Sequence, residues 1–166
     1  MNRLPSLKLT LPYTIASANL SSPIEIVILD YNSSDGLEDY IRNLPSTSVA
    51  PAPGNFITYV RYTGNPHFHI SHARNLANLA SHGDYLSQAG AEMKIASSFF
   101  PNVRTAIADG TPKFLVRAYN INNSYYPRWS PQIAIVERKE FIASGGFDER
   151  IEYFWFEDRD LAARLI

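Results

Sequence analysis

Two adjacent carboxylates near the end of the sequence are the clearest candidates for chemistry. Glu157 and Asp158 follow residues 153–156, YFWF, and precede a segment patterned as a helix. Aromatic rings pack against the C–H faces of sugars, and a partly desolvated carboxylate beside them can have the raised pKa of a general base. Acids at a helix N-terminus also interact favourably with the helix dipole, which needs no ligand. The pattern therefore leaves open both a sugar site and a purely structural helix start.

A second candidate site follows the most apolar run in the first half of the sequence. Residues 24–29, IEIVIL, are typical of a strand buried on both faces in a parallel sheet. Asp30 and the turn-forming residues 31–36 come next. Ligands of open α/β sheets bind beyond the carboxyl ends of the strands, so Asp30 can accept a hydrogen bond from a base or ribose, and the loop N–H groups are expected to be free for a ligand. An Asx-turn that caps the next helix explains the same residues without a ligand.

Arg74 lies in the first turns of a predicted helix over residues 70–80, closed by Gly83. Its position beside the apolar face allows the guanidinium to stack on a base or to bind phosphate oxygens. A solvated surface charge is the simpler explanation of a helical arginine. Four histidines are crowded into the same region, but their spacing matches no zinc pattern (His67, His69, His72 and His82).

The elements that must position these residues alternate along the chain. Apolar spacing predicts helices over residues 4–15, 37–44, 70–80 and 156–166, and strands over residues 24–29, 56–62, 84–91, 113–119 and 133–137. Pro12 is expected to kink or end the first helix. Strands that alternate with helices indicate an α/β fold with a mainly parallel sheet.

Composition bounds the class of protein without naming a function. The 166 residues fit one domain, and 45% hydrophobic with 19% charged residues is ordinary for a globular protein. With 15 Lys and Arg against 16 Asp and Glu, no net charge attracts nucleic acid. No apolar run approaches the roughly 20 residues of a membrane span, and the N-terminus lacks a secretory h-region. The absence of cysteine fits a reducing compartment, so we expect a cytoplasmic location or peripheral attachment to a membrane.

Three segments together resemble the family 2 glycosyltransferases and the related galactosyltransferase-like enzymes of the GT-A fold. They are residues 24–36 (IEIVILDYNSSDG), 72–86 (HARNLANLASHGDYL) and 145–165 (GGFDERIEYFWFEDRDLAARL), whereas residues 101–131 match poorly. Three blocks with family-like spacing are more specific than any one of them. The resemblance implies a single domain, residues 1–166, with a GT-A-like (Rossmann-like) sheet flanked by helices. It also implies transfer of a sugar from a nucleotide-diphosphate sugar to the hydroxyl of a glycan or other acceptor, as in polysaccharide biosynthesis.

The resemblance also implies roles for individual residues. Asp158 is expected to be the general base of an inverting reaction, with Glu157 beside it. The first block and the ARN helix are expected to bind the nucleotide-sugar (Asp30, Asn32, Ser33, Asp35 and Arg74). The acceptor side is expected to include Gly145, Gly146, Phe147, Asp148 and Trp155.

Metal use is left open by a departure from the family pattern. The family normally follows its GDYL-like strand with Asp-x-Asp, whose last carboxylate binds the cation that bridges the diphosphate. In this sequence Gly90 replaces the first acid, and Glu92 stands in the place of the second. Mn²⁺ or Mg²⁺ held by Glu92 and diphosphate oxygens would be bound less firmly than by two carboxylates.

A second departure concerns the ends of the chain. The family's first strand should precede the helix that begins near Asn2, and further segments should follow residue 166, so the resemblance implies truncation at both ends. A catalytically inactive carbohydrate- or nucleotide-binding remnant of the same fold is the alternative. A dinucleotide-binding enzyme is disfavoured because no GxGxxG follows the first strand.

Overall fold

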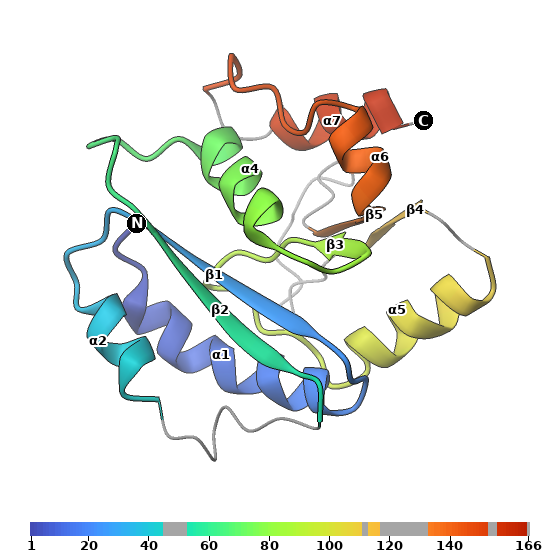
Figure 1. Ribbon diagram of the computed structural model, residues 1–166, viewed down its shortest axis with the longest axis horizontal. Helices are drawn as coiled ribbons and strands as arrows, with labels where there is room; N and C mark the ends of the chain where they lie inside the picture. Colours follow the sequence, from blue (N-terminus) through green and yellow to red (C-terminus); the bar gives the residue numbers. More distant parts are fainter. Residues whose placement is uncertain (45–52, 111–112, 117–132, 153–155, 166) are drawn as a thin grey trace, which may run out of the picture. The chain divides into compact units, whose positions relative to one another are not determined.

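A computed structural model describes residues 1–44, 53–110, 113–116, 133–152 and 156–165. The chain divides into two compact units, each of which is described by itself. Unit 1 comprises residues 1–68, 80–82 and 90–111, and unit 2 comprises residues 69–79, 83–89 and 112–166. Helices and strands alternate along the described chain from α1 to β4, as Figure 1 shows, which confirms the predicted α/β class.

Unit 1 contains the predicted parallel sheet. Strand β1 (Glu25–Tyr31) pairs in parallel with β2 (Phe56–Tyr62), in a register that runs from Glu25 opposite Phe56 to Tyr31 opposite Tyr62. Within its described residues, this unit contains the helices α1 (Leu4–Asn19), α2 (Leu37–Arg42) and α5 (Phe99–Ala108). Because the strands are parallel, their carboxyl ends lie at the same edge, where the loop after β1 begins.

Helix α1 is longer than predicted, and the expected effect of Pro12 as a terminator was wrong. The helix continues through Pro12 to Asn19. Pro12 is on the exposed side of the helix, so the carbonyl that loses its intrahelical partner can be hydrated. Beyond it, Ser17 and Ala18 are fully buried, and the Ser17 hydroxyl donates to the Ser97 carbonyl at 3.1 Å. Tertiary packing therefore outweighs the local cost of proline.

Unit 2 is built around an antiparallel sheet. Its elements are α4 (Ile70–Ala80), β3 (Tyr85–Ser87), β4 (Lys113–Val116), β5 (Ile133–Glu137), α6 (Arg138–Ala143) and α7 (Glu157–Leu165). Strand β5 lies between β3 and β4 and is antiparallel to both. A buried cluster joins the sheet to α6 and α7, and its members are Leu86, Val136, Phe141, Phe147 and Leu161.

Several elements differ from their predicted extents. The strand predicted over residues 84–91 is only three residues long, because the chain leaves β3 after Ser87. Helices α5 and α6 were not predicted: α5 carries Pro101 within its first turn, and α6 has only six residues. The order of elements along the chain also gives no sign that the second sheet is antiparallel.

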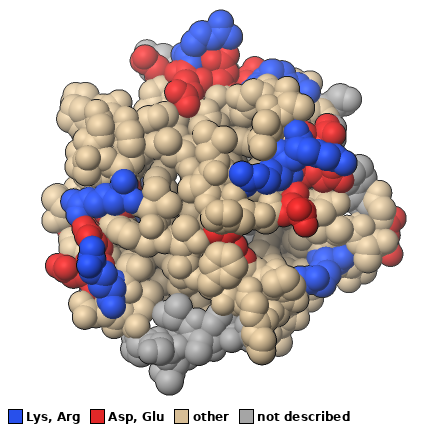
Figure 2. All heavy atoms as spheres, viewed as in Figure 1, with Lys and Arg blue, Asp and Glu red and all other residues tan. Residues whose placement is uncertain are grey.

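The surface carries no large field of one sign on the face shown in Figure 2, where basic and acidic side chains lie in mixed groups. Arg42 and Arg61 both bind Glu38 in unit 1, and Arg150 binds Asp148 in unit 2. This arrangement agrees with the near-neutral composition. Within the described ranges, no helix combines the length and apolarity that crossing a bilayer requires.

Candidate active site

Asp30, at the end of β1, is held by two internal hydrogen bonds. Only 1% of its surface is exposed. Its Oδ1 accepts from the Ser33 backbone N–H at 2.8 Å, and its Oδ2 accepts from the Tyr59 hydroxyl at 2.7 Å. Burial and the neighbouring Asp30 carboxylate raise the pKa of Tyr59 well above its ordinary value, so the hydroxyl stays a donor. Asp30 therefore braces the loop between the two parallel strands.

The rest of the predicted nucleotide loop is tied to the start of α1. Asp35 Oδ2 accepts from the Leu4 backbone N–H at 2.8 Å, and Ser33 Oγ accepts from the Asn2 backbone N–H at 3.0 Å. The Ser34 N–H donates to Asn2 Oδ1 at 2.8 Å. The expectation that the loop N–H groups are free for a ligand was wrong for Ser33 and Ser34, because neighbouring side chains already accept from them. Asn32 has a left-handed backbone, with φ of 53°.

The Tyr59→Phe variant should reveal how much this brace contributes. Removing the hydroxyl leaves a buried carboxylate oxygen without its donor, and hydrogen bonds to charged groups contribute about 1.5–3 kcal/mol. We expect the free energy of unfolding to fall by about that amount in urea titrations. Tyr13→Phe is the control, because Tyr13 is exposed and packs its ring under Lys94. Equal midpoints and slopes for Tyr59→Phe and the parent chain would contradict this role.

Glu92, the predicted metal residue, belongs to the same unit as the nucleotide loop. Burial lowers the pKa of the Met1 amino group, and the carboxylates of Asp30, Asp35 and Glu92 oppose that effect. All three carboxylates therefore act electrostatically on the Met1 amino group. Across the described ranges, however, no three His, Cys, Asp or Glu side chains are close enough together to hold a metal ion.

In unit 2, Glu157 and Asp158 begin α7 and share one guanidinium. Arg74 Nη1, from α4, donates to Glu157 Oε1 at 3.0 Å and to Asp158 Oδ1 at 2.5 Å. The Glu157 side chain is only 2% exposed, and among the described residues its Oε2 has no hydrogen-bond partner. Asp158 is 16% exposed and thus remains accessible.

The surroundings of Asp158 favour proton uptake. Burial raises the pKa of Asp158 above its ordinary value, Arg74 opposes that shift, and the neighbouring Glu157 carboxylate adds to it. A partly exposed carboxylate with a raised pKa is suited to general base catalysis. Structural ion pairs can also shift pKa values, so this property marks a candidate rather than a function.

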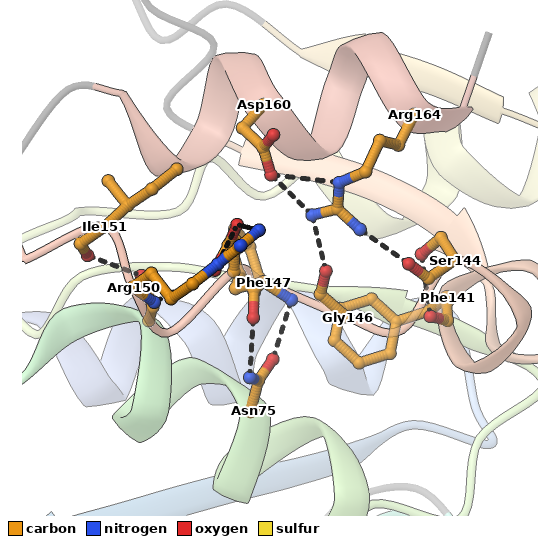
Figure 3. Close-up of polar contacts among 11 residues, drawn as sticks. Asn75, Phe141, Ser144, Gly146, Phe147, Arg150, Ile151, Asp160 and Arg164 are labelled. Atoms are coloured by element: carbon orange, nitrogen blue, oxygen red, sulfur yellow. Dashed lines mark hydrogen bonds and ion pairs between the residues drawn. The ribbon is translucent and has the colours of Figure 1, made fainter.

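The loop after α6 forms the wall of a cavity of about 450 Å³. The cavity is lined by Asn75, residues 144–150 and Arg164. Figure 3 shows polar contacts among several of these residues. Arg164 donates to the carbonyls of Ser144 and Gly146, both at 2.6 Å, and also binds Asp160. Four predicted acceptor-side residues therefore line one cavity: Gly145, Gly146, Phe147 and Asp148.

Phe147 also lines this cavity, although its side chain belongs to the core. The residue is 2% exposed, and its ring packs against Phe141 with centroids 5.9 Å apart. Because the ring belongs to the core, it cannot stack on an acceptor, and only its backbone can border the cavity. The guanidinium carbon of Arg74 lies 5.2 Å from the ring centroid. Trp155, the other aromatic acceptor-side candidate, lies outside the described residues.

Asn75 is a site residue that the sequence interpretation missed. Its amide donates to the Phe147 carbonyl at 2.9 Å, and its Oδ1 accepts from the Phe147 N–H at 2.8 Å. The position next to Arg74 in the ARN segment was a signal, but an asparagine in a helix gives no hint of a partner more than seventy residues away. The expectation that Asp30 and Arg74 both bind the nucleotide-sugar stays a prediction, and the two residues belong to different units.

Comparisons with solved structures identify the fold. A mannosyltransferase, PcManGT from Pyrobaculum calidifontis, in complex with GDP-Man and Mn²⁺, matches with a TM-score of 0.73 and 19% identity, over 99% of this chain and 49% of that one. TarS residues 1–349 from S. aureus match with a TM-score of 0.70 and 14% identity, over 99% and 52% of the two chains. The chain has the GT-A-like fold of glycosyltransferases.

The chain thus spans about half the length of these two structures. No protein-family model and no curated protein sequence matches it. The predicted fold is confirmed, whereas the identities are too low to transfer a substrate.

Proposed function

We propose that this chain contributes the nucleotide-sugar-binding part of a family 2-like inverting glycosyltransferase. The observation that carries the proposal is Asp158, a partly buried carboxylate with a raised pKa at the start of α7, within a GT-A-like fold. The GDP-Man bound to the mannosyltransferase neighbour supports a nucleotide-diphosphate sugar as donor. A glycan acceptor of polysaccharide biosynthesis and a cytoplasmic location are further expectations from the sequence resemblance.

The proposed reaction needs one proton acceptor and an open face of the sugar. Asp158 takes the proton of the acceptor hydroxyl while the hydroxyl oxygen attacks the anomeric carbon. The bond from that carbon to the diphosphate oxygen breaks on the opposite side, so the configuration inverts and the nucleoside diphosphate leaves. In this proposal the loop after β1 serves the donor (Asp30, Asn32, Ser33 and Asp35), and the cavity beside Gly145, Gly146 and Asp148 receives the acceptor.

Product analysis tests this reaction. The chain, and the longest protein that contains it, would be incubated with a panel of nucleotide-diphosphate sugars and simple glycosides, and products would be followed by proton NMR. We expect nucleoside diphosphate release and a product whose anomeric configuration is opposite to that of the donor. Retained configuration would contradict the role of Asp158 as base, and no release with any donor would contradict the transferase proposal.

Manganese binding gives a separate prediction. Because only Glu92 replaces the family's acidic pair, we expect weak manganese binding without a nucleotide, and we assign no reaction step to a metal. A Cβ at Gly90 would lie 2.7 Å from Glu92 Oε1, so Gly90→Asp would place a second carboxylate beside the first once the Glu92 side chain moves. Calorimetry should then show stronger manganese binding.

The control for this prediction is Gly90→Asn, which has the same shape without the charge. It should bind manganese as weakly as the parent chain does. Tight manganese binding by the parent chain in the absence of nucleotide would show that one carboxylate is enough and that the doubt about metal use was wrong.

A further inference from the structure

The guanidinium of Arg74 is placed to act on the proposed base. A single nitrogen of Arg74 contacts both carboxylates at the start of α7, at 3.0 Å from Glu157 and 2.5 Å from Asp158. Three quarters of the Arg74 side chain is buried, since 25% of its surface is exposed. A charged group in such surroundings is screened less by water than a surface ion pair, so its orientation affects its partners more strongly.

Phe147 helps to hold the side chain of Arg74 in position. The buried ring of Phe147 lies against the guanidinium, with 5.2 Å between the guanidinium carbon and the ring centroid. The backbone of Phe147 is in turn held on both its N–H and its C=O by the side-chain amide of Asn75, as Figure 3 shows. Asn75 therefore holds the residue whose ring packs against the guanidinium of Arg74, its neighbour on α4.

We propose that Arg74 is a positioning residue for Asp158, and that Asn75 and Phe147 keep Arg74 in place. This inference rests on the proposed function, in which Asp158 is the general base. It differs from the role that the sequence resemblance implied for Arg74, which was binding of the nucleotide.

The arrangement has two physical consequences for Asp158. Binding Oδ1 restricts the orientation of the carboxylate, because Arg74 Nη1 donates to that oxygen at 2.5 Å. The positive charge also favours the ionised form, whereas Glu157, on the same helix, favours the protonated form. Arg74 from α4 and Glu157 are the charged groups that act on Asp158 within the described part of the chain. Without Arg74, the two adjacent carboxylates would repel each other and Asp158 would be protonated at higher pH.

Kinetics on Arg74→Met and Arg74→Lys test the inference. For Arg74→Met we expect kcat to fall by about 10²-fold, the cost of small misplacement of a reacting group. The acidic limb of its pH–kcat profile should move to higher pH, while donor affinity measured by calorimetry stays unchanged. Arg74→Lys keeps the charge, so its acidic limb should stay near that of the parent chain even though its kcat is lower. Arg42→Met, which breaks an exposed pair with Glu38, is the control and should change neither readout.

Loss of donor affinity in Arg74→Met, with an unmoved acidic limb, would overturn the inference and restore the nucleotide role. NMR titration of the ¹³C-labelled Asp158 carboxyl, assigned with Asp158→Asn, separates this inference from the proposed function because it needs no turnover. A rise in the pKa of Asp158 in Arg74→Met supports the positioning role even if no donor is turned over. An unchanged pKa refutes it even if the parent chain transfers sugar. If Arg74→Met does not fold, a lower pKa of Asp158 in Arg74→Lys than in an Arg74→Gln variant gives the same support, and equal values refute it.

Discussion

The Asp158→Asn variant is expected to transfer sugar about 10²–10⁴-fold more slowly than the parent chain, the usual contribution of a general base. The amide preserves the shape of the side chain, and its oxygen can still accept from Arg74, but it cannot take the proton of an acceptor hydroxyl. Donor affinity should hardly change, because the proposed base contacts the acceptor. Transfer rate, donor affinity and melting temperature would be measured on the same preparation.

A purely structural role for Asp158 gives a different result. Favourable interaction with the helix dipole predicts a loss of about 0.3–1 kcal/mol in stability and little specific effect on turnover. Asp39→Asn is the matched control, since Asp39 is an exposed acid in the first turn of α2. If Asp158→Asn behaves as Asp39→Asn does, melting slightly lower but transferring sugar normally, Asp158 has no part in the mechanism.

The Gly146→Ala variant is expected to show the largest loss of stability. Gly146 has φ of 71°, a region that costs other residues about 1–2 kcal/mol. An added Cβ would also lie 2.7 Å from Asn75 Oδ1 and 3.2 Å from Phe141 Cζ. The Asn75 side chain would have to move, which breaks its hydrogen bonds to Phe147 at about 0.5–1.5 kcal/mol each. We therefore expect the free energy of unfolding to fall by about 2–5 kcal/mol in urea.

The adjacent glycine supplies the control for that prediction. Gly145 has φ of 81°, but an added Cβ there meets no atom within 4 Å. Gly145→Ala should therefore cost only the backbone term, about 1–2 kcal/mol. In a double-mutant cycle, Asn75→Ala should reduce the cost of Gly146→Ala, because the clashing oxygen is gone. Equal losses for the two glycine variants would show that the contact with Asn75 contributes nothing.

The local sequence pattern was enough to predict the bounds of those strands and helices whose own residues show a clear apolar periodicity. The strand over residues 56–62, the strand over residues 133–137 and the helix over residues 70–80 were predicted at the bounds that the structure shows. The continuation of α1 through Pro12 could not be predicted, because it depends on burial of Ser17 and Ala18 against distant parts of unit 1. The antiparallel pairing of β5 could not be predicted from the sequence either, since strand direction depends on contacts between segments far apart in sequence.

In the candidate site, too, residues with a local sequence signal could be predicted, and contacts between distant segments could not. Glu157 and Asp158 are neighbours in the sequence, so their types alone identified them as a pair. The partner of that pair, Arg74, lies more than eighty residues away, and no spacing rule joins the two segments. The sequence could not show that the ring of Phe147 packs in the core, because an aromatic residue after two glycines looks the same whether its ring faces a ligand or the core. Burial decided between these alternatives.

Calorimetric titration of the chain with a panel of nucleotide-diphosphate sugars, with and without manganese, tests whether this domain binds a sugar donor. We expect at least one of these donors to bind saturably, and Asp158→Asn to bind the same donor with the same affinity. A folded chain that binds none of the donors, with or without manganese, would contradict the assignment of this domain as the nucleotide-sugar-binding part of a glycosyltransferase.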